Sequence, residues 1–159
     1  MKKTNQSGFS LIELLIVVAI IGIIAAIAIP NLLASKRAAN EGSAQSSLRT
    51  IYSCEMTYQA STGAGAFGTM ADLRGDFLTD EVLGSGTKSG YNFTVAEIIA
   101  PAPGVLAQFY SQGDPVIDSG VGQTGTRQFC VAENGVIRAG IAVTPVADRA
   151  ACDALSPLQ

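Results

Sequence analysis

The chain has 159 residues, of which 48% are hydrophobic and 14% charged, and its formal net charge at pH 7 is −3. This length fits one domain with a modest core. The absence of histidine excludes histidine-bearing zinc sites and both Ser-His-Asp and Cys-His catalysis. After Lys36 and Arg37 the basic residues are scattered singly, so the sequence offers no basic patch for nucleic acid. We therefore expect no enzyme, no cofactor, no metal and no nucleic-acid partner.

The N-terminus combines a short polar leader, MKKTNQSG, with a long apolar segment. Residues 14–30 contain no charge, and the segment 9–33 forms about 37 Å of helix, which is enough to cross about 30 Å of hydrocarbon. Lys2 and Lys3 favour a cytoplasmic leader, which sends the rest of the chain across the membrane. We therefore divide the chain into a leader (1–8), a transmembrane and assembly helix (9–33), and the remainder of the helix with a globular head (34–159).

Glu13 is the residue that a simple membrane anchor would not keep. A lone carboxylate costs about 2.5 to 3.5 kcal/mol on membrane-insertion scales. One interpretation is that Glu13 lies near the cytoplasmic interface and reaches water. The other requires a cut after Gly8, which would create an amine at Phe9 that Glu13 of a neighbouring subunit neutralises within a bundle of helices.

The stretch GFSLIELLIVVAIIGIIAAIAIPNLL resembles the N-terminal signature of type IV prepilins and pseudopilins, with matches at Gly8, Phe9, Glu13, Gly22 and Pro30. The resemblance implies that a membrane prepilin peptidase cuts between Gly8 and Phe9 and N-methylates Phe9. It also implies that an ATPase-driven assembly machine in the inner membrane draws subunits out of the lipid into a helical filament of identical copies on the cell surface.

Gly22 and Pro30 delimit the weakest part of the predicted helix. Glycine costs about 1 kcal/mol relative to alanine inside a helix, and proline removes one hydrogen bond and clashes with the preceding turn. The resemblance implies that this segment extends when subunits pack in the filament. The alternative is that both are ordinary membrane-helix residues, because such helices tolerate glycine and proline.

The sequence of the remaining residues predicts an α+β head. The helix continues to about Ala60 with an apolar stripe at spacings of three and four, made of Ala44, Leu48, Ile51, Tyr52, Cys54 and Tyr58. A loop with one or two short helical turns follows, and then about three or four antiparallel strands. These are expected at 91–96, at 105–111, and in a hairpin of 127–132 with 136–141, in which Asn134-Gly135 favours a type I′ turn. The long helix packed against this sheet is also the architecture that the resemblance implies.

Cys130 and Cys152 lie in the exported head, where an oxidising compartment favours a disulfide that would pin the tail to the sheet. Such a bridge has its counterpart in the C-terminal disulfide loop of many type IV pilins. Cys54, on the helix, is interpreted as a small buried apolar residue.

Two further patterns are set aside. GSGTKSG at residues 84–90 lacks the adjacent Gly-Lys of a phosphate loop, and we interpret it as a flexible turn. Asp72, Asp76, Asp80 and Glu81 lie close in sequence but without the spacing of an EF-hand loop, so we interpret them as solvated charges rather than a calcium site.

Three functions remain open. The chain is expected to be a structural subunit of a type IV pilus serving adhesion, motility or DNA uptake. The alternatives are a pseudopilin of type II secretion and a membrane-anchored binding module that does not polymerise. Major pseudopilins usually lack the C-terminal cysteine pair, so Cys130 and Cys152 favour the pilin.

Overall fold

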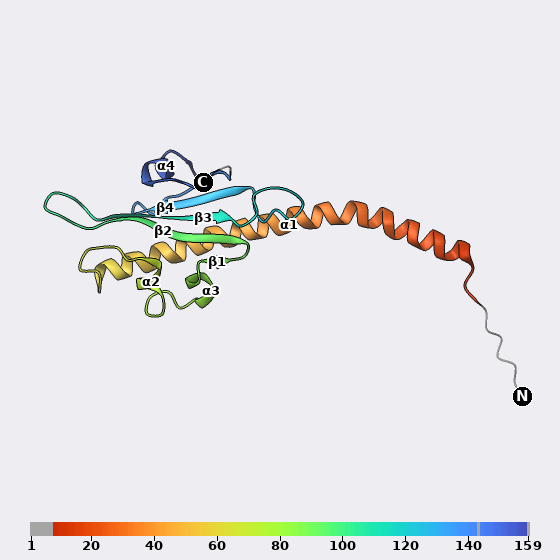
Figure 1. Cartoon of the computed structure of the whole chain (residues 1–159), viewed down its shortest axis with the longest axis horizontal. Coiled ribbons are helices and arrows are strands. Elements are labelled where there is room, and N and C mark those ends of the chain that lie inside the picture. The colour runs from red at the N-terminus through yellow and green to blue at the C-terminus, as the bar shows by residue number, and fades with distance from the viewer. Residues whose placement is uncertain (1–7, 143, 159) are drawn as a thin grey trace, which may run out of the picture. The chain divides into compact units, whose positions relative to one another are not determined.

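A computed structural model of the chain describes residues 8–142 and 144–158, so the predicted leader lies outside the described residues except for Gly8. The chain divides into two compact units, residues 1–35 and residues 36–159. Helix α1, Leu11–Ala60, begins in the first unit and ends in the second (Figure 1). The long N-terminal helix expected from the sequence is therefore present, beginning two residues after Phe9.

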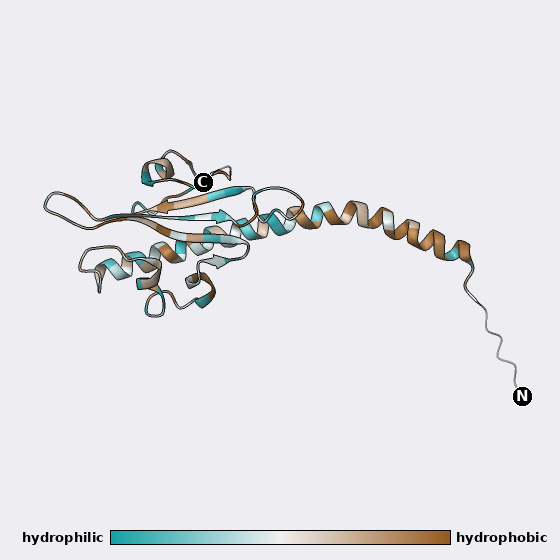
Figure 2. Cartoon of the chain, in the orientation of Figure 1, coloured by the Kyte–Doolittle hydropathy of each residue, from teal (hydrophilic) through white to brown (hydrophobic). Residues whose placement is uncertain are grey.

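In the first unit, α1 carries its apolar side chains on every side. The large apolar residues from Leu11 to Leu32 keep between 50% and 80% of their surface exposed, and Figure 2 shows hydrophobic residues throughout this part of the helix. Among the described residues, α1 is the one helix long and apolar enough to cross a membrane, judged by length and composition. The helix continues through Pro30 without a break, so unwinding between Gly22 and Pro30 stays a prediction.

The second unit contains one antiparallel sheet whose strands neighbour each other in chain order. Its strands are β1 (Thr87–Lys88), β2 (Tyr91–Ile99), β3 (Gln108–Pro115), β4 (Arg127–Ala132), β5 (Ile137–Ile141) and β6 (Ser156–Pro157). The α+β class is confirmed. The expected number of strands was too small, because the two-residue strands β1 and β6 are too short to show a pattern in the sequence.

Strand β3 lies further along the chain than the sequence indicated. The expected strand at 105–111 is wrong at its start, because Ala102 and Val105 pair with each other in a tight turn around Gly104, which has a φ of +82°. Leu106 follows with 84% of its surface exposed. Pairing with β2 instead extends to Pro115, which lies opposite Tyr91.

The hairpin between β4 and β5 forms where it was predicted, but with another turn. The amide of Gly135 donates to the carbonyl of Ala132. A type I′ turn needs positive φ at both central residues, and among the described non-glycine residues only Ala64 and Ser89 have positive φ. Gly135 itself has a φ of +72°. The type I′ prediction was therefore wrong, and a turn followed by a left-handed glycine replaces it.

The main core lies between α1 and one face of the sheet. The predicted stripe supplies its helix side, with Ala44, Leu48 and Ile51 fully buried and Cys54 at 8% exposure. The sheet side consists of Tyr91, Phe93, Phe129, Val131 and Ile137. This arrangement confirms the interpretation of Cys54 as a buried residue.

Two short helices, α2 (Met70–Leu73) and α3 (Glu81–Gly84), cover the edge of this core. Asp72 forms a capping box with Thr69 at the start of α2. Asp80 caps α3 and pairs with Lys88 at 2.7 Å. Two of the four acidic residues considered for calcium thus already bind protein donors. The GSGTKSG segment includes the end of α3 and strand β1.

The opposite face of the sheet is covered by the C-terminal tail, which contains helix α4 (Arg149–Asp153) (Figure 1). Tyr110, Cys130 and Ala132 point to this side and pack against Val146 and Cys152. Over β3 and β4 the head therefore has three layers, helix, sheet and tail. Helix α4 was not predicted from the sequence.

Candidate processing and assembly site

The first turn of α1 begins with a hydrogen bond between Ser10 and Glu13, of which Glu13 belongs to the predicted site. The backbone N–H of Ser10 donates to Oε2 of Glu13 at 2.9 Å, and the amide of Leu14 donates to the carbonyl of Ser10 at 3.3 Å. Ser10 thus occupies the N-cap position, and Glu13 reaches back to it from the third helical position. The spacing Ser-x-x-Glu is the sequence signal of this arrangement, and it was not among the predictions made from the sequence.

The peptide bond between Gly8 and Phe9 lies just before this cap. The Phe9 side chain is 91% exposed, and a Cβ added to Gly8 would meet no atom within 4 Å. Gly8, Phe9 and Glu13 therefore lie together at the start of α1, with the bond between the first two open to an approaching enzyme. Gly22 and Pro30 lie further along the same helix, in which each residue advances about 1.5 Å along the axis.

The position of Glu13 has an electrostatic consequence. A helix N-terminus carries unpaired N–H groups and a partial positive charge, which favours a carboxylate in the first turn. Glu13 therefore has a partner on its own chain before any subunit joins it. Because the carboxylate has two oxygens, binding Ser10 leaves it able to accept a second, stronger donor such as an amine.

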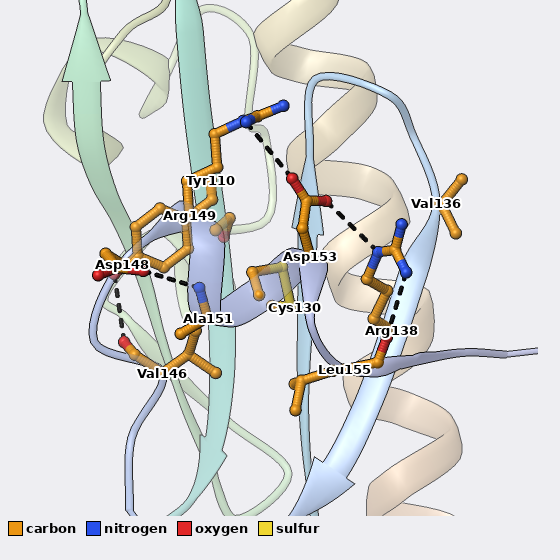
Figure 3. The surroundings of a disulfide bond; sticks show 12 residues. Tyr110, Cys130, Val136, Arg138, Val146, Asp148, Arg149, Ala151, Asp153 and Leu155 are labelled. Atoms are coloured by element: carbon orange, nitrogen blue, oxygen red, sulfur yellow. Dashed lines mark hydrogen bonds and ion pairs between the residues drawn. A yellow bond between two sulfur atoms is a disulfide. The ribbon is translucent and has the colours of Figure 1, made fainter.

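The predicted disulfide is present, and it connects the tail to the centre of the sheet. Cys130 on β4 and Cys152 on α4 are bonded, with their Cα atoms 6.0 Å apart and both residues fully buried. Beside the disulfide, Arg138 of β5 lies 3.5 Å from Asp153 and donates to the carbonyl of Leu155 at 3.1 Å (Figure 3). The tail is thus bound to the sheet by an ion pair as well as by the disulfide.

Three further contacts fix the tail. The hydroxyl of Tyr110 donates to the carbonyl of Val146 at 3.2 Å, and the carboxylate of Asp148 accepts from the amide of Ala151 at 2.7 Å (Figure 3). Arg149 binds Glu133 in the β4–β5 turn through two nitrogens. The tail therefore has a defined conformation from residue 146 to residue 155.

On the other side of the sheet, Glu41 connects α1 to the segment between β3 and β4, residues 116–126, which we call the β3–β4 loop. Its carboxylate accepts from the amide of Thr126 at 2.9 Å, from the hydroxyl of Thr126 at 2.6 Å and from Nε of Arg127 at 2.8 Å. Burial alone would raise the pKa of Glu41, but these donors outweigh it and lower the pKa below its usual value of 4.5. No sequence pattern pointed to this contact.

Glu55 is the second carboxyl that sequence reasoning missed. It is fully buried on α1, and Oε2 accepts from the amide of Gly68 at 2.9 Å. Among the described residues, Oε1 has no hydrogen-bond partner. Burial, together with the charge of Asp72, raises the pKa of Glu55 to about 7, although the Gly68 amide opposes the shift.

The geometry defines a class of protein, an α+β head that continues from an apolar N-terminal helix with a processing motif at its start. The family model described as the prokaryotic N-terminal methylation motif matches residues 3–29. The match covers 27 of the chain's 159 residues and identifies the methylation motif at the N-terminal end of this helix.

Three known proteins are similar to part of this chain. The type IV major pilin protein PilA of Myxococcus xanthus is 47% identical over 54 residues, which are 34% of this chain and 24% of that protein. The type IV wide pilus major component PilA4 of Thermus thermophilus is 65% identical over 37 residues, 23% of this chain and 28% of that protein. The type II secretion system core protein G of Aeromonas hydrophila is 42% identical over 48 residues, 30% of this chain and 34% of that protein.

The aligned segments thus span about a quarter to a third of these relatives. No solved structure matches the chain.

Proposed function

We propose that the chain is a structural subunit of a type IV pilus. The observation that carries the proposal is the methylation motif on an apolar helix whose first turn brings together an exposed Gly8–Phe9 bond and Glu13. The similarity of part of the chain to two pilus components supports it.

In the proposed pathway, the precursor is held in the inner membrane by residues 9–33 with its head in the periplasm. A prepilin peptidase cuts between Gly8 and Phe9 and methylates the new amine. The cut leaves the apolar helix on the mature chain, so the same segment serves first as membrane anchor and then as the core of a filament of identical copies. The exposure of its large side chains supports this, since they need lipid or other helices to cover them.

Glu13 is proposed to guide assembly. In a bundle with little water, the positive amine of Phe9 on one copy and the carboxylate of Glu13 on the next attract each other strongly, and either one alone would be costly. The Ser10 amide already bound to Glu13 in the single chain does not neutralise its charge. An incoming amine therefore adds charge compensation that the cap cannot supply, and repetition of the pair would set the stagger between subunits.

A pseudopilin of type II secretion is the second candidate, favoured by the match to core protein G of Aeromonas hydrophila. The Cys130–Cys152 bond supports the pilin instead, on the expectation that major pseudopilins usually lack this pair.

A membrane-anchored module that does not polymerise is the third candidate. The Ser10 cap gives Glu13 a local use in such a protein as well, so the carboxylate by itself does not exclude it.

The test is mass spectrometry of filaments sheared from the surface of cells that produce the chain. The expected N-terminal peptide begins with N-methylated Phe9. Intact Met1 in assembled filaments, or a cut downstream of Pro30, would overturn the assignment. A mature chain absent from sheared filaments but required for secretion of other proteins would identify the pseudopilin, and one required for neither would support the third candidate.

A further inference from the structure

The β3–β4 loop exposes an apolar surface that neither the core nor the proposed filament helix uses. Val116 and Ile117 are 48% and 45% exposed, and Val121 is 84% exposed. The side chain of Ile117 lies beside Gly122, within 3.8 Å of where a Cβ there would stand. Ile117 therefore lies close to Gly122, the residue that follows Val121 on this loop.

The loop has a defined backbone that holds these side chains outward. The amide of Thr124 donates to the carbonyl of Ile117 at 2.9 Å, and the amide of Ile117 donates back to the hydroxyl of Thr124 at 3.1 Å. Between them, Nε2 of Gln123 donates to the carbonyl of Asp118 at 2.6 Å. The exposed valine thus stands at the turn of a hydrogen-bonded loop.

This loop is fastened to α1 close to the end of the apolar segment. Nη1 of Arg37 donates to Oε1 of Gln123 at 2.8 Å, and Nδ2 of Asn40 donates to the carbonyl of Thr124 at 2.8 Å. Arg37 follows Leu33, the last residue of the expected span, by about 6 Å of helix. The polar layer on each side of a bilayer is about 5 to 7 Å thick, so Arg37, which binds the loop, lies within that distance of the end of the expected span, measured along the helix.

We propose that the β3–β4 loop docks the head of the unassembled subunit onto the phospholipid surface from which α1 emerges. Val121 and Ile117 enter the boundary between head groups and acyl chains, and Lys36 and Arg37 approach the lipid phosphates. The inference rests on the membrane anchoring in the proposed function.

The charged residues near the loop favour a phospholipid surface as its partner. Neither Lys36 nor Arg37 belongs to the ion pairs found among the described residues, which are Lys88–Asp80, Arg127–Glu41, Arg138–Asp153, Arg149–Glu133 and Arg149–Asp153. Asp118 is the one acidic residue of the loop sequence and opposes binding to an anionic surface. Two basic residues beside one acidic residue and an apolar loop tip match a surface of anionic lipid.

The opposite end of β3 provides an internal control. Val105 and Leu106, which precede that strand, are 47% and 84% exposed. The eight residues of β3 separate this turn from the β3–β4 loop by about 26 Å at 3.3 Å per residue. A head that touches lipid only through the β3–β4 loop therefore leaves Leu106 in water, although the exposure of Leu106 equals that of Val121.

The experiment uses the absence of tryptophan from the sequence. Full-length single-tryptophan variants Val121→Trp, Leu106→Trp and Ile20→Trp are reconstituted into vesicles of phosphatidylethanolamine and phosphatidylglycerol that contain phospholipid with brominated acyl chains. Quenching of tryptophan fluorescence by bromine reports contact with lipid. We expect quenching at Ile20→Trp and Val121→Trp and none at Leu106→Trp.

A second pair of variants tests the charges. Lys36→Gln, placed in the Val121→Trp background, should reduce quenching at least about twofold, because α1 loses a cation that attracts the head to the anionic surface. Arg49→Gln in the same background is the matched control, since Arg49 is exposed on α1 about 18 Å beyond Arg37. That change should leave the quenching unaltered.

Each remaining outcome counts against a definite statement. Quenching at Ile20→Trp without quenching at Val121→Trp refutes the docking of the loop and leaves the anchor intact. No quenching at Ile20→Trp refutes the anchor, and with it the proposed function and this inference. A Val121→Trp signal that escapes bromine but shifts to shorter wavelength as the ratio of protein to lipid rises would assign the loop to contact with a second copy, which also refutes lipid docking.

Discussion

Replacing Glu55 by glutamine should make the head more stable at alkaline pH. The pKa of Glu55 is about 7 in the folded chain and near 4.5 when unfolded, because burial and the charge of Asp72 oppose ionisation. A raised folded-state pKa stabilises the fold fully below pH 4.5, and this contribution is lost as the pH rises through 7. A difference of that size corresponds to about 3 kcal/mol. Glutamine has nearly the same shape, keeps an acceptor for the Gly68 amide and cannot ionise.

The assay is urea unfolding of the full chain in a mild detergent, followed by circular dichroism at several pH values. Glu55→Gln and wild type should have similar unfolding free energies at pH 4.5, and the variant should exceed wild type by up to about 3 kcal/mol at pH 8. Glu81→Gln, an exposed change on α3, should match wild type throughout. A difference between Glu55→Gln and wild type that stays constant from pH 4.5 to pH 8 would refute the reasoning, because the carboxyl would then titrate alike in both states.

Three other changes follow from the structure. Glu13→Val should leave membrane insertion and cleavage intact but sharply reduce filament yield, measured by shearing and immunoblotting, and wild-type yield would contradict the assembly role. Cys152→Ser should lower the unfolding free energy by about 3 kcal/mol, because it opens the loop of 22 residues that the disulfide closes. The measurement is urea unfolding with and without reductant, in which only the wild type should respond to the reductant. Glu41→Gln should cost about 2 kcal/mol and speed amide exchange at Thr126, since the charged acceptor of three donors is lost; unchanged exchange would show that the loop is held by other contacts.

The elements that the sequence predicted are those with a local cause. The apolar run and the stripe ending near Ala60 predicted α1, because the periodicity of a helix can be recognised from residues that are near each other in the sequence. Asn134-Gly135 placed the hairpin correctly, although the type of turn was wrong. Glycine is the residue most favoured in the left-handed conformation found at position 135, so the position of the turn was better determined than the conformation of Asn134.

The remaining features depend on residues that are distant in sequence. Strand β3 carries polar Gln112 and Asp114 on the side where the tail approaches, so its pattern does not resemble a half-buried strand. Glu41 binds residues more than 80 positions away, and the buried Glu55 resembles any helical glutamate until the chain around Gly68 covers it. The Ser10–Glu13 cap is different, because its signal was local and was overlooked.

The two edges of the sheet explain how such a head tolerates crowding. Each outer strand has only two residues, and they contain Lys88 at one edge and Pro157 at the other. A short outer strand with a charge or a proline hinders a strand from another molecule from pairing with it. In the proposed filament, identical heads are held side by side at very high local concentration, the condition under which open edges would join sheets into aggregates. The outer strands β1 and β6 therefore disfavour sheet-to-sheet pairing where they lie, which favours contacts between copies through helices and side chains.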